Sequence, residues 1–168
     1  MTKKTKNLTR AALIAALYVA LTLLQNALLP GTASMAIQVR ISEALCVLAF
    51  FTPAAIPGLT AGCFLFNLSS TYALPLDFLV GSAASFLSAG LMYLTRKHTV
   101  KGYPLPGMLM PALCNGVLVG WELSVYVGGG FWLNALYVAL GEAIALLTFG
   151  TGLFYAIRAR NLDSRLLN

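Results

Sequence analysis

Two long apolar stretches, residues 11–95 and 102–157, make up most of this 168-residue chain. Short clusters of basic residues flank them, and turn-forming residues, such as Pro30-Gly31 and the three glycines at 128–130, interrupt them. A transmembrane helix needs roughly 20 apolar residues. The pattern therefore predicts six spans, at about residues 11–29, 42–53, 55–71, 77–95, 106–127 and 131–157.

The segment between residues 41 and 72 is the ambiguous part of this pattern, because Pro53 and Pro57 interrupt it. Two crossings of about 15 residues, each about 22 Å long, place the basic clusters before and after it on the same side of the membrane. Local thinning of the bilayer accommodates helices this short. We therefore expect one all-α domain over residues 1–168, a polytopic bundle of six transmembrane helices.

The charged residues are few and are sorted by sign along the chain. Only 10% of the residues are charged and 59% are hydrophobic, whereas soluble domains carry about 25% charged residues. Basic residues at the ends of apolar spans indicate the cytoplasmic side, so we expect a multi-pass protein of the plasma membrane with both termini in the cytoplasm. The net charge of +6 indicates anionic headgroups rather than nucleic acid as its partner, because the bases flank spans. Ten of the eleven bases lie in three clusters: Lys3, Lys4, Lys6, Arg10; Arg96, Lys97, Lys101; Arg158, Arg160, Arg165.

Four of the five acidic residues lie inside the apolar stretches. In the predicted topology they fall in the outer half of the membrane or at its midplane. Ionisable residues within spans are costly and by default indicate a functional site. We therefore expect a cavity that opens to the exterior and collects these carboxylates: Glu43, Asp77, Glu122 and Glu142.

Polar and aromatic residues accompany these acids on the last two predicted helices. Asn115 and Glu122 are seven residues apart and therefore share a helix face. Together with Glu142, Trp121 and Trp132, they offer acceptors, an amide and aromatic faces, which suit a flat, donor-rich and cationic heterocycle. Two other interpretations stay open. The tryptophans fit an interfacial aromatic belt, and Glu142 fits a protonated or amide-paired packing residue.

Four further polar residues also have structural interpretations. Arg40 and Glu43, three residues apart, form a local ion pair or contact the ligand. Asp77, after Pro75 and before an apolar run, fits an N-cap. Asn67 bonds across helices or lines the cavity.

Ala12, Ala16 and Ala20 recur every four residues on the first predicted helix. A stripe of small residues allows another helix to approach closely, either within the bundle or from a partner subunit. The chain contains no P-loop and no HExxH motif, and its single histidine, His98, lies in a basic loop. We therefore expect no enzyme, no metal site and no cofactor in this chain, and the energy for transport comes from an ion gradient or from a separate ATPase.

The most distinctive stretch is IQVRISEAL at residues 37–45, followed by Pro57-Gly58-Leu59, Gly62-Cys63 and Asn67. With Asp77 and Gly81-Ser82, Asn115 and Trp121-Glu122, and Gly141-Glu142-Ala143, it resembles the QueT family of queuosine-precursor transporters. These are substrate-binding S components of energy-coupling factor (ECF) importers. The resemblance covers nearly the whole chain.

This resemblance implies a six-helix S component that captures a 7-deazaguanine such as preQ1 from outside. Its partners would be the coupling subunit, which docks on the alanine stripe, and two ATPases that use ATP. We expect Glu142 to bind the heterocycle edge and Glu122 or Glu43 the ligand's cation, and Arg40, at the mouth of the second predicted helix, to contact the ligand as well. Asn115 and Asn67 would orient the ring, and Trp121 or Trp132 would stack on it.

Two other functions remain as alternatives. One is an S component for another vitamin or nucleobase. The other is an ion-coupled carrier, although such carriers are usually built from internal repeats and none is visible in this sequence. A purely structural role leaves the buried acids unexplained.

Overall fold

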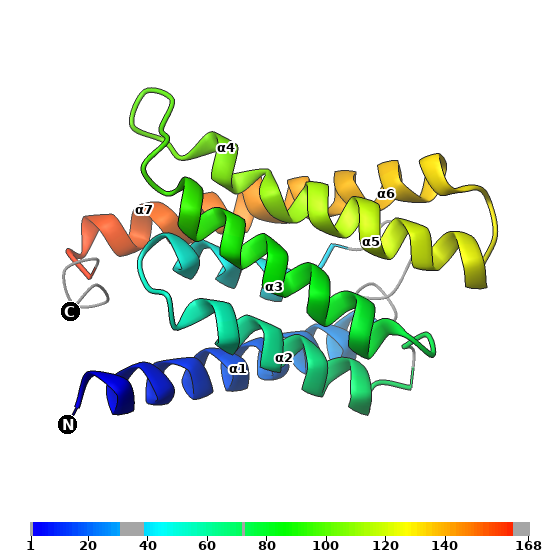
Figure 1. Cartoon of the computed structure of the whole chain (residues 1–168), viewed down its shortest axis with the longest axis horizontal. Coiled ribbons are helices and arrows are strands. Elements are labelled where there is room, and N and C mark those ends of the chain that lie inside the picture. The colour runs from blue at the N-terminus through cyan, green and yellow to red at the C-terminus, as the bar shows by residue number, and fades with distance from the viewer. Residues whose placement is uncertain (1, 31–38, 72, 163–168) are drawn as a thin grey trace.

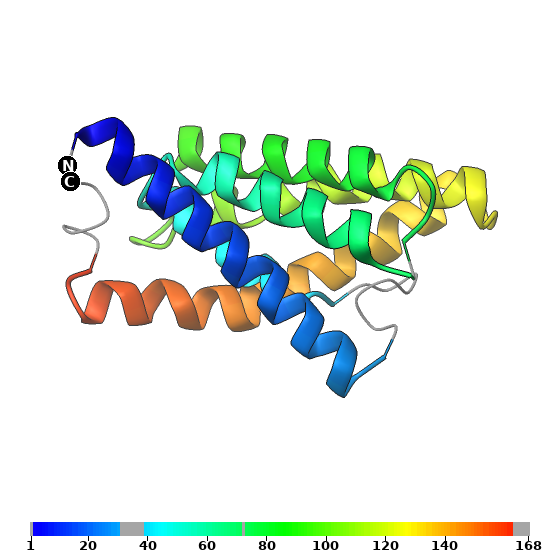
Figure 2. The ribbon, with the colours of Figure 1, turned by 90° about the horizontal axis from the view of Figure 1, so that it is seen from below.

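The computed structural model describes residues 2–30, 39–71 and 73–162. Helices arranged along the long axis of the molecule form one bundle (Figure 1). α1 begins and α7 ends at the same end of the bundle, and α1 runs obliquely across the other helices (Figure 2). The elements are α1 (Lys3–Leu28), η1 (Ile41–Phe50), α2 (Ala55–Ser69), α3 (Asp77–Thr95), α4 (Leu105–Met108), α5 (Met110–Tyr126), α6 (Phe131–Ala145), η2 (Leu146–Gly150) and α7 (Thr151–Ala159).

These elements form the six predicted crossings. Four helical stretches of the described chain are long and apolar enough to span a membrane, namely Lys3–Leu28, Asp77–Thr95, Leu105–Tyr126 and Phe131–Ala159. The two shorter apolar helices are η1 and α2, and they occupy the region with the interrupting prolines. The all-α, six-helix membrane fold predicted from the sequence is confirmed.

The second crossing, η1, is a 3-10 helix of ten residues, and this form was not foreseen. A 3-10 helix rises about 2.0 Å per residue and an α-helix about 1.5 Å. Ten residues therefore cover about 20 Å instead of about 15 Å. The tighter winding lets a short segment reach further through the bundle.

η1 lies at the centre of the bundle, in contact with α1, α3, η2 and α7. Eight of its ten residues are buried. Cys46, Val47 and Ala49 are completely buried, in a core that also contains Tyr18 of α1 and Phe154 of α7. Opposite Val47, the last crossing widens into the π-helical turn η2, where Gly150 lies close to the valine side chain.

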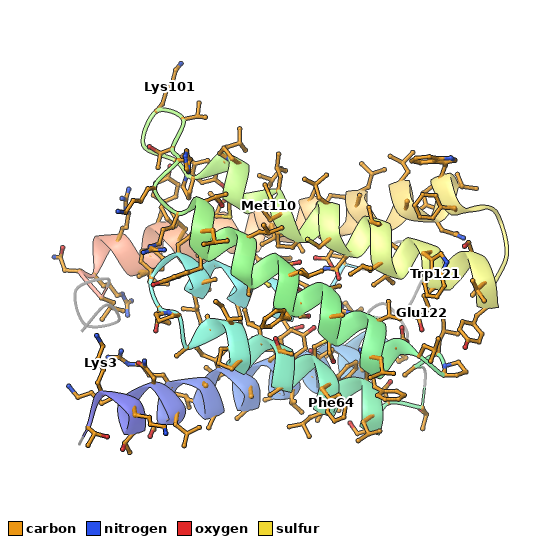
Figure 3. The ribbon with its side chains drawn as sticks, viewed as in Figure 1. Lys3, Phe64, Lys101, Met110, Trp121 and Glu122 are labelled. Carbon is orange, nitrogen blue, oxygen red and sulfur yellow. The ribbon has the colours of Figure 1, made fainter. Side chains whose placement is uncertain are left out.

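The basic and acidic residues, which are separated along the chain, are also separated in space. Lys3 and Lys101 project from one end of the bundle, whereas Glu122 lies toward the other end (Figure 3). Arg96 and Arg158 lie at the ends of α3 and α7, on the side of the two lysines. The molecule therefore has a basic end and an opposite end near which acidic side chains lie.

Glycines allow two helix pairs to pack at short distance. A Cβ atom on Gly62 of α2 would lie 2.8 Å from the Tyr18 Cβ of α1. A Cβ atom on Gly120 of α5 would lie 2.6 Å from the Ala135 Cα of α6. Neither a Cα nor a Cβ atom moves when a side chain rotates, so these contacts cannot be relieved that way, and these glycines set the separation of the helices.

We expect Gly120→Ala to destabilise the bundle, because the added methyl group would force α5 and α6 apart. Overpacking of this kind costs about 1–3 kcal/mol, equivalent to a fall of roughly 2–12 °C in the unfolding temperature. Thermal unfolding of the purified protein in detergent measures this. Gly90→Ala is the matched control, since a Cβ atom there meets nothing within 4 Å and alanine favours the helix. An equal loss in both variants would contradict the proposed packing constraint.

Candidate functional site

Four carboxylates and one guanidinium are buried together inside the bundle. Glu43, Asp77, Glu122 and Glu142 are each at most 6% exposed, and so is Arg40. Arg40 is close enough to interact electrostatically with all four acids. The acids therefore form one buried cluster around a single cation.

Each charged residue of this cluster comes from a position fixed by the fold. Arg40 immediately precedes η1 and Glu43 lies in its first turn. Asp77 is the first residue of α3, while Glu122 lies on the buried face of α5 and Glu142 on that of α6. Four separate elements thus converge on Arg40. The cavity open to the exterior, in which we expected the four acids to gather, stays a prediction.

Glu43 has a hydrogen-bond donor on each carboxyl oxygen. The Tyr18 hydroxyl donates to Oε1 at 2.6 Å, and the Cys46 thiol donates to Oε2 at 3.2 Å. The donors come from α1 and from the next turn of η1. Glu43 therefore joins these two elements, and the protein itself already meets much of its hydrogen-bonding capacity.

A polar stripe on α1 holds the start of η1 in place. The Gln25 side chain donates from Nε2 to the Val39 carbonyl at 2.6 Å and accepts from the Ile41 amide at 2.8 Å. The Thr22 hydroxyl lies 2.7 Å from the Ser42 hydroxyl. Because Arg40 lies between Val39 and Ile41, this stripe also positions the central cation.

These α1 residues were missed by the sequence analysis. Tyr18, Thr22 and Gln25 are spaced four and three residues apart, so they share one face of the helix. A periodic polar face in an otherwise apolar span was the signal that could have identified them. It marks the side of α1 that faces the bundle interior.

Asp77 does not act as an N-cap, contrary to our expectation. It is the first residue within α3, and Leu76 occupies the N-cap position. Its Oδ2 atom accepts from the Leu74 amide at 2.7 Å, within the preceding turn. The carboxylate thus stabilises the turn that leads into α3.

Asn67 forms the cross-helix bond that was one of its two predicted roles. Its Nδ2 atom donates to the Asp77 carbonyl at 2.9 Å, which connects α2 to α3. A Cβ atom on Gly81 would lie 2.7 Å from the same Nδ2 atom. Asn67 is therefore held by α3, and this contact supports the turn that positions Asp77.

Three other buried side chains carry polar atoms that have no hydrogen-bond partner among the described residues: Glu122 at both Oε1 and Oε2, Glu142 at Oε2 and Asn115 at Nδ2. Asp77 and the backbone of Leu76 lie near Glu122 without meeting the geometry of a hydrogen bond. Buried polar atoms are nearly always paired in native proteins. The unpaired acceptors of the acidic cluster, and the unpaired donor of Asn115 on the buried face of α5, are therefore available to a bound ligand.

The cluster also carries an excess of potential negative charge. Four carboxylates against one guanidinium give a formal charge of −3 when all are ionised. Burying charges without partners in a membrane interior is costly. The site can therefore accept a cation that also donates hydrogen bonds.

The two tryptophans lie outside this cluster. Trp121 is 49% exposed and Trp132 is 83% exposed, and Trp132 packs edge-on against Phe131. Their rings therefore do not line the buried site, and the stacking role suggested for them has no support in this geometry. Their exposure agrees with the interfacial belt, which was the other interpretation.

Ala12, Ala16 and Ala20 are exposed on α1. The packing of α1 against α2 uses the neighbouring face, where Ile14, Ala15 and Tyr18 are buried. The three alanines line one wall of an open groove of about 730 Å³ between α1 and α2. Docking of a partner on this groove remains a prediction, and the alanines themselves stay accessible.

Comparison with known proteins supports one assignment. No curated protein and no solved structure matches the chain. A family model described as "QueT transporter" matches residues 8–159, which include all six crossings and the whole buried cluster. The resemblance inferred from the sequence is confirmed, and this membrane protein belongs to the QueT transporter family.

Proposed function

We propose that this transporter is the substrate-binding S component of an ECF importer and captures a cationic 7-deazaguanine such as preQ1. Membership of a transporter family agrees with a protein that is not an enzyme. This proposal rests mainly on one observation. Glu122 and Glu142, in a cluster with an excess of carboxylates, carry polar atoms without a hydrogen-bond partner among the described residues, and so does Asn115 on the buried face of α5.

The chemistry of these atoms matches such a ligand. Two carboxylates offer acceptors, and the Asn115 Nδ2 atom offers a donor. A 7-deazaguanine presents a ring N–H and an amino group beside a carbonyl oxygen, and its aminomethyl substituent is an ammonium. The ligand would thus supply what each unpaired atom lacks and would offset part of the negative charge.

The spacing on α5 refines the roles of the residues. Asn115 and Glu122 lie about 10.5 Å apart along the helix axis, far enough to bracket one edge of a base. Glu122, with two unpaired oxygens, suits the paired N–H donors, and Asn115 suits the carbonyl. Glu142 then faces the ammonium. This exchanges the roles that the sequence suggested for the two glutamates.

Import by an ECF complex would need partner subunits, because the sequence contains no nucleotide-binding motif. We propose that the coupling subunit docks on the exposed alanine groove of α1 and α2, and that two cytoplasmic ATPases drive uptake. An ion-coupled carrier remains the second candidate, since a buried carboxylate without a partner also suits a coupling ion. Dependence of uptake on the ATPases separates the two functions.

We expect Glu122→Gln and Glu142→Gln each to weaken preQ1 binding by roughly 10- to 150-fold, because each removes a charge-assisted hydrogen bond worth about 1.5–3 kcal/mol. Isothermal titration calorimetry with purified protein measures the affinity. Trp132→Leu is the control and should change the affinity less than about twofold, since its ring is exposed. Unchanged affinity in both glutamine variants would disprove the site.

The positive charge of the ligand should contribute strongly to binding. We expect preQ1 to bind at least about tenfold more tightly than preQ0, whose nitrile carries no charge, because the ammonium is paired with a buried carboxylate. Competition between the two compounds for the purified protein measures the ratio. Equal affinities would show that the carboxylate excess is not used to recognise a cation.

Filling the groove on α1 should block uptake without affecting ligand binding. Ala16→Trp places a bulky ring in the groove, so we expect uptake by cells that also express the ATPase module to fall about tenfold or more. PreQ1 affinity should stay within about twofold. Leu13→Trp is the matched control, because Leu13 is exposed on α1 and does not line the groove. Uptake that needs no ATPase module would disprove the ECF assignment.

A further inference from the structure

A second concave site lies at the basic end of the bundle, away from the acidic cluster. It is a half-open pocket of about 230 Å³. Its apolar side is formed by Phe50, Phe51 and Phe154, whose rings contact one another. Its polar side is formed by Arg96, Thr99 and Arg158.

The two arginines reach the pocket from different helix ends. Arg96 follows α3 and Arg158 lies in the last turn of α7. The Arg96 Nη1 atom donates to the Tyr93 carbonyl at 2.6 Å, and its guanidinium lies 3.8 Å from the centre of the Tyr93 ring. The Arg158 guanidinium lies 5.0 Å from the Phe154 ring centre, and its Nη1 atom donates to the Gly102 carbonyl at 3.4 Å. Contacts with aromatic rings and with backbone carbonyls thus restrain both guanidinium groups.

Most of the N–H donors of these two guanidinium groups remain available for a ligand. A guanidinium has five N–H donors, and each arginine directs one of its nitrogens at a backbone carbonyl. Neither forms an ion pair with a carboxylate within residues 2–30, 39–71 and 73–162. The acids that the structure describes belong to the cluster around Arg40 instead. Within the described part of the chain, the pocket therefore presents two positive charges and a hydroxyl with no carboxylate paired to the arginines.

We propose that this pocket binds the phosphate group of an anionic phospholipid. Two guanidiniums can hold phosphate oxygens in paired hydrogen bonds. The phenylalanine rings close the apolar side of the pocket with their small exposed edges, and the exposed side chains of Leu94 and Tyr155 offer apolar surface to the acyl carbons. A volume of about 230 Å³ equals that of about eight waters, which is room for a phosphodiester. This site is independent of the proposed transport function.

A lipid is favoured over a free anion by the location of the pocket. Basic residues at the ends of spans lie at the level of the lipid headgroups. On the same helices, Leu94 precedes Arg96 and Tyr155 precedes Arg158, and both side chains are more than half exposed. Apolar side chains next to the charged ones suit a molecule with a charged head and an apolar tail.

The test compares binding of dioleoyl phosphatidylglycerol and dioleoyl phosphatidylcholine to the full chain in neutral detergent, by native mass spectrometry and by thermal stabilisation. Wild-type protein should retain phosphatidylglycerol preferentially. Arg96→Gln combined with Arg158→Gln should need about tenfold more of this lipid, because charge-assisted hydrogen bonds are lost. The matched control, Lys97→Gln with Arg160→Gln, removes two charges next to the same arginines but does not line the pocket.

Each outcome decides the proposal. A clearly larger loss in the arginine pair than in the control pair supports a defined site. Equal losses, or no preference for phosphatidylglycerol, would overturn it in favour of a diffuse basic surface. Inorganic phosphate is tested in the same way. If it stabilises the protein, and if this stabilisation needs the two arginines as much as lipid binding does, the lipid assignment is overturned in favour of a free phosphate site. Should the double variant fail to fold, Arg158→Gln alone, at an exposed residue, should still weaken lipid binding about fivefold.

Discussion

The arrangement of this bundle depends on the burial of four carboxylates around one guanidinium. In a membrane interior such groups are costly unless they are paired and hydrogen bonded. The positive charge of Arg40 offsets part of this penalty. Hydrogen bonds from Tyr18 and Cys46 to Glu43, and from the Leu74 amide to Asp77, offset more of it. Glu122 and Glu142 keep oxygens without partners. The fold therefore provides hydrogen-bond donors to Glu43 and Asp77 and none, among the described residues, to oxygens of Glu122 and Glu142. This uneven distribution is what the proposed ligand site requires.

The packing around η1 explains how so many polar groups meet in a small protein. A 3-10 helix lengthens a short crossing, which places Arg40 near one end of the segment and Phe50 and Phe51 near the other. The same segment thus contributes to the acidic cluster and to the aromatic wall of the basic pocket. Glycines bring α2 against α1 and α6 against α5. Close helices leave little space, so the polar contacts have fixed geometry.

Much of the fold could be predicted from the sequence, because apolar length and basic clusters follow directly from the bilayer. A gathering of Glu43, Asp77, Glu122 and Glu142 could also be expected, since all four fell in the outer half of the membrane or at its midplane. It was harder to predict in which direction around the helix axis each side chain points. Trp121 adjoins the buried Glu122 but points outward, because adjacent residues differ by about 100°. Hydrogen-bond partners such as Tyr18 for Glu43 join segments 25 residues apart, and no local pattern specifies that pairing.

Helix α1 connects the interior site to the surface of the protein. One of its faces binds η1 through Tyr18, Thr22 and Gln25, while Ala12, Ala16 and Ala20 remain open on another. A helix held in this way cannot rotate or slide without disturbing bonds to Glu43 and to the backbone on both sides of Arg40. Any partner that shifts α1 would thereby move the central cation relative to Glu122 and Glu142. For the cation site proposed at these acids, a shift of α1 would therefore change the local charge balance and with it the affinity for the cation.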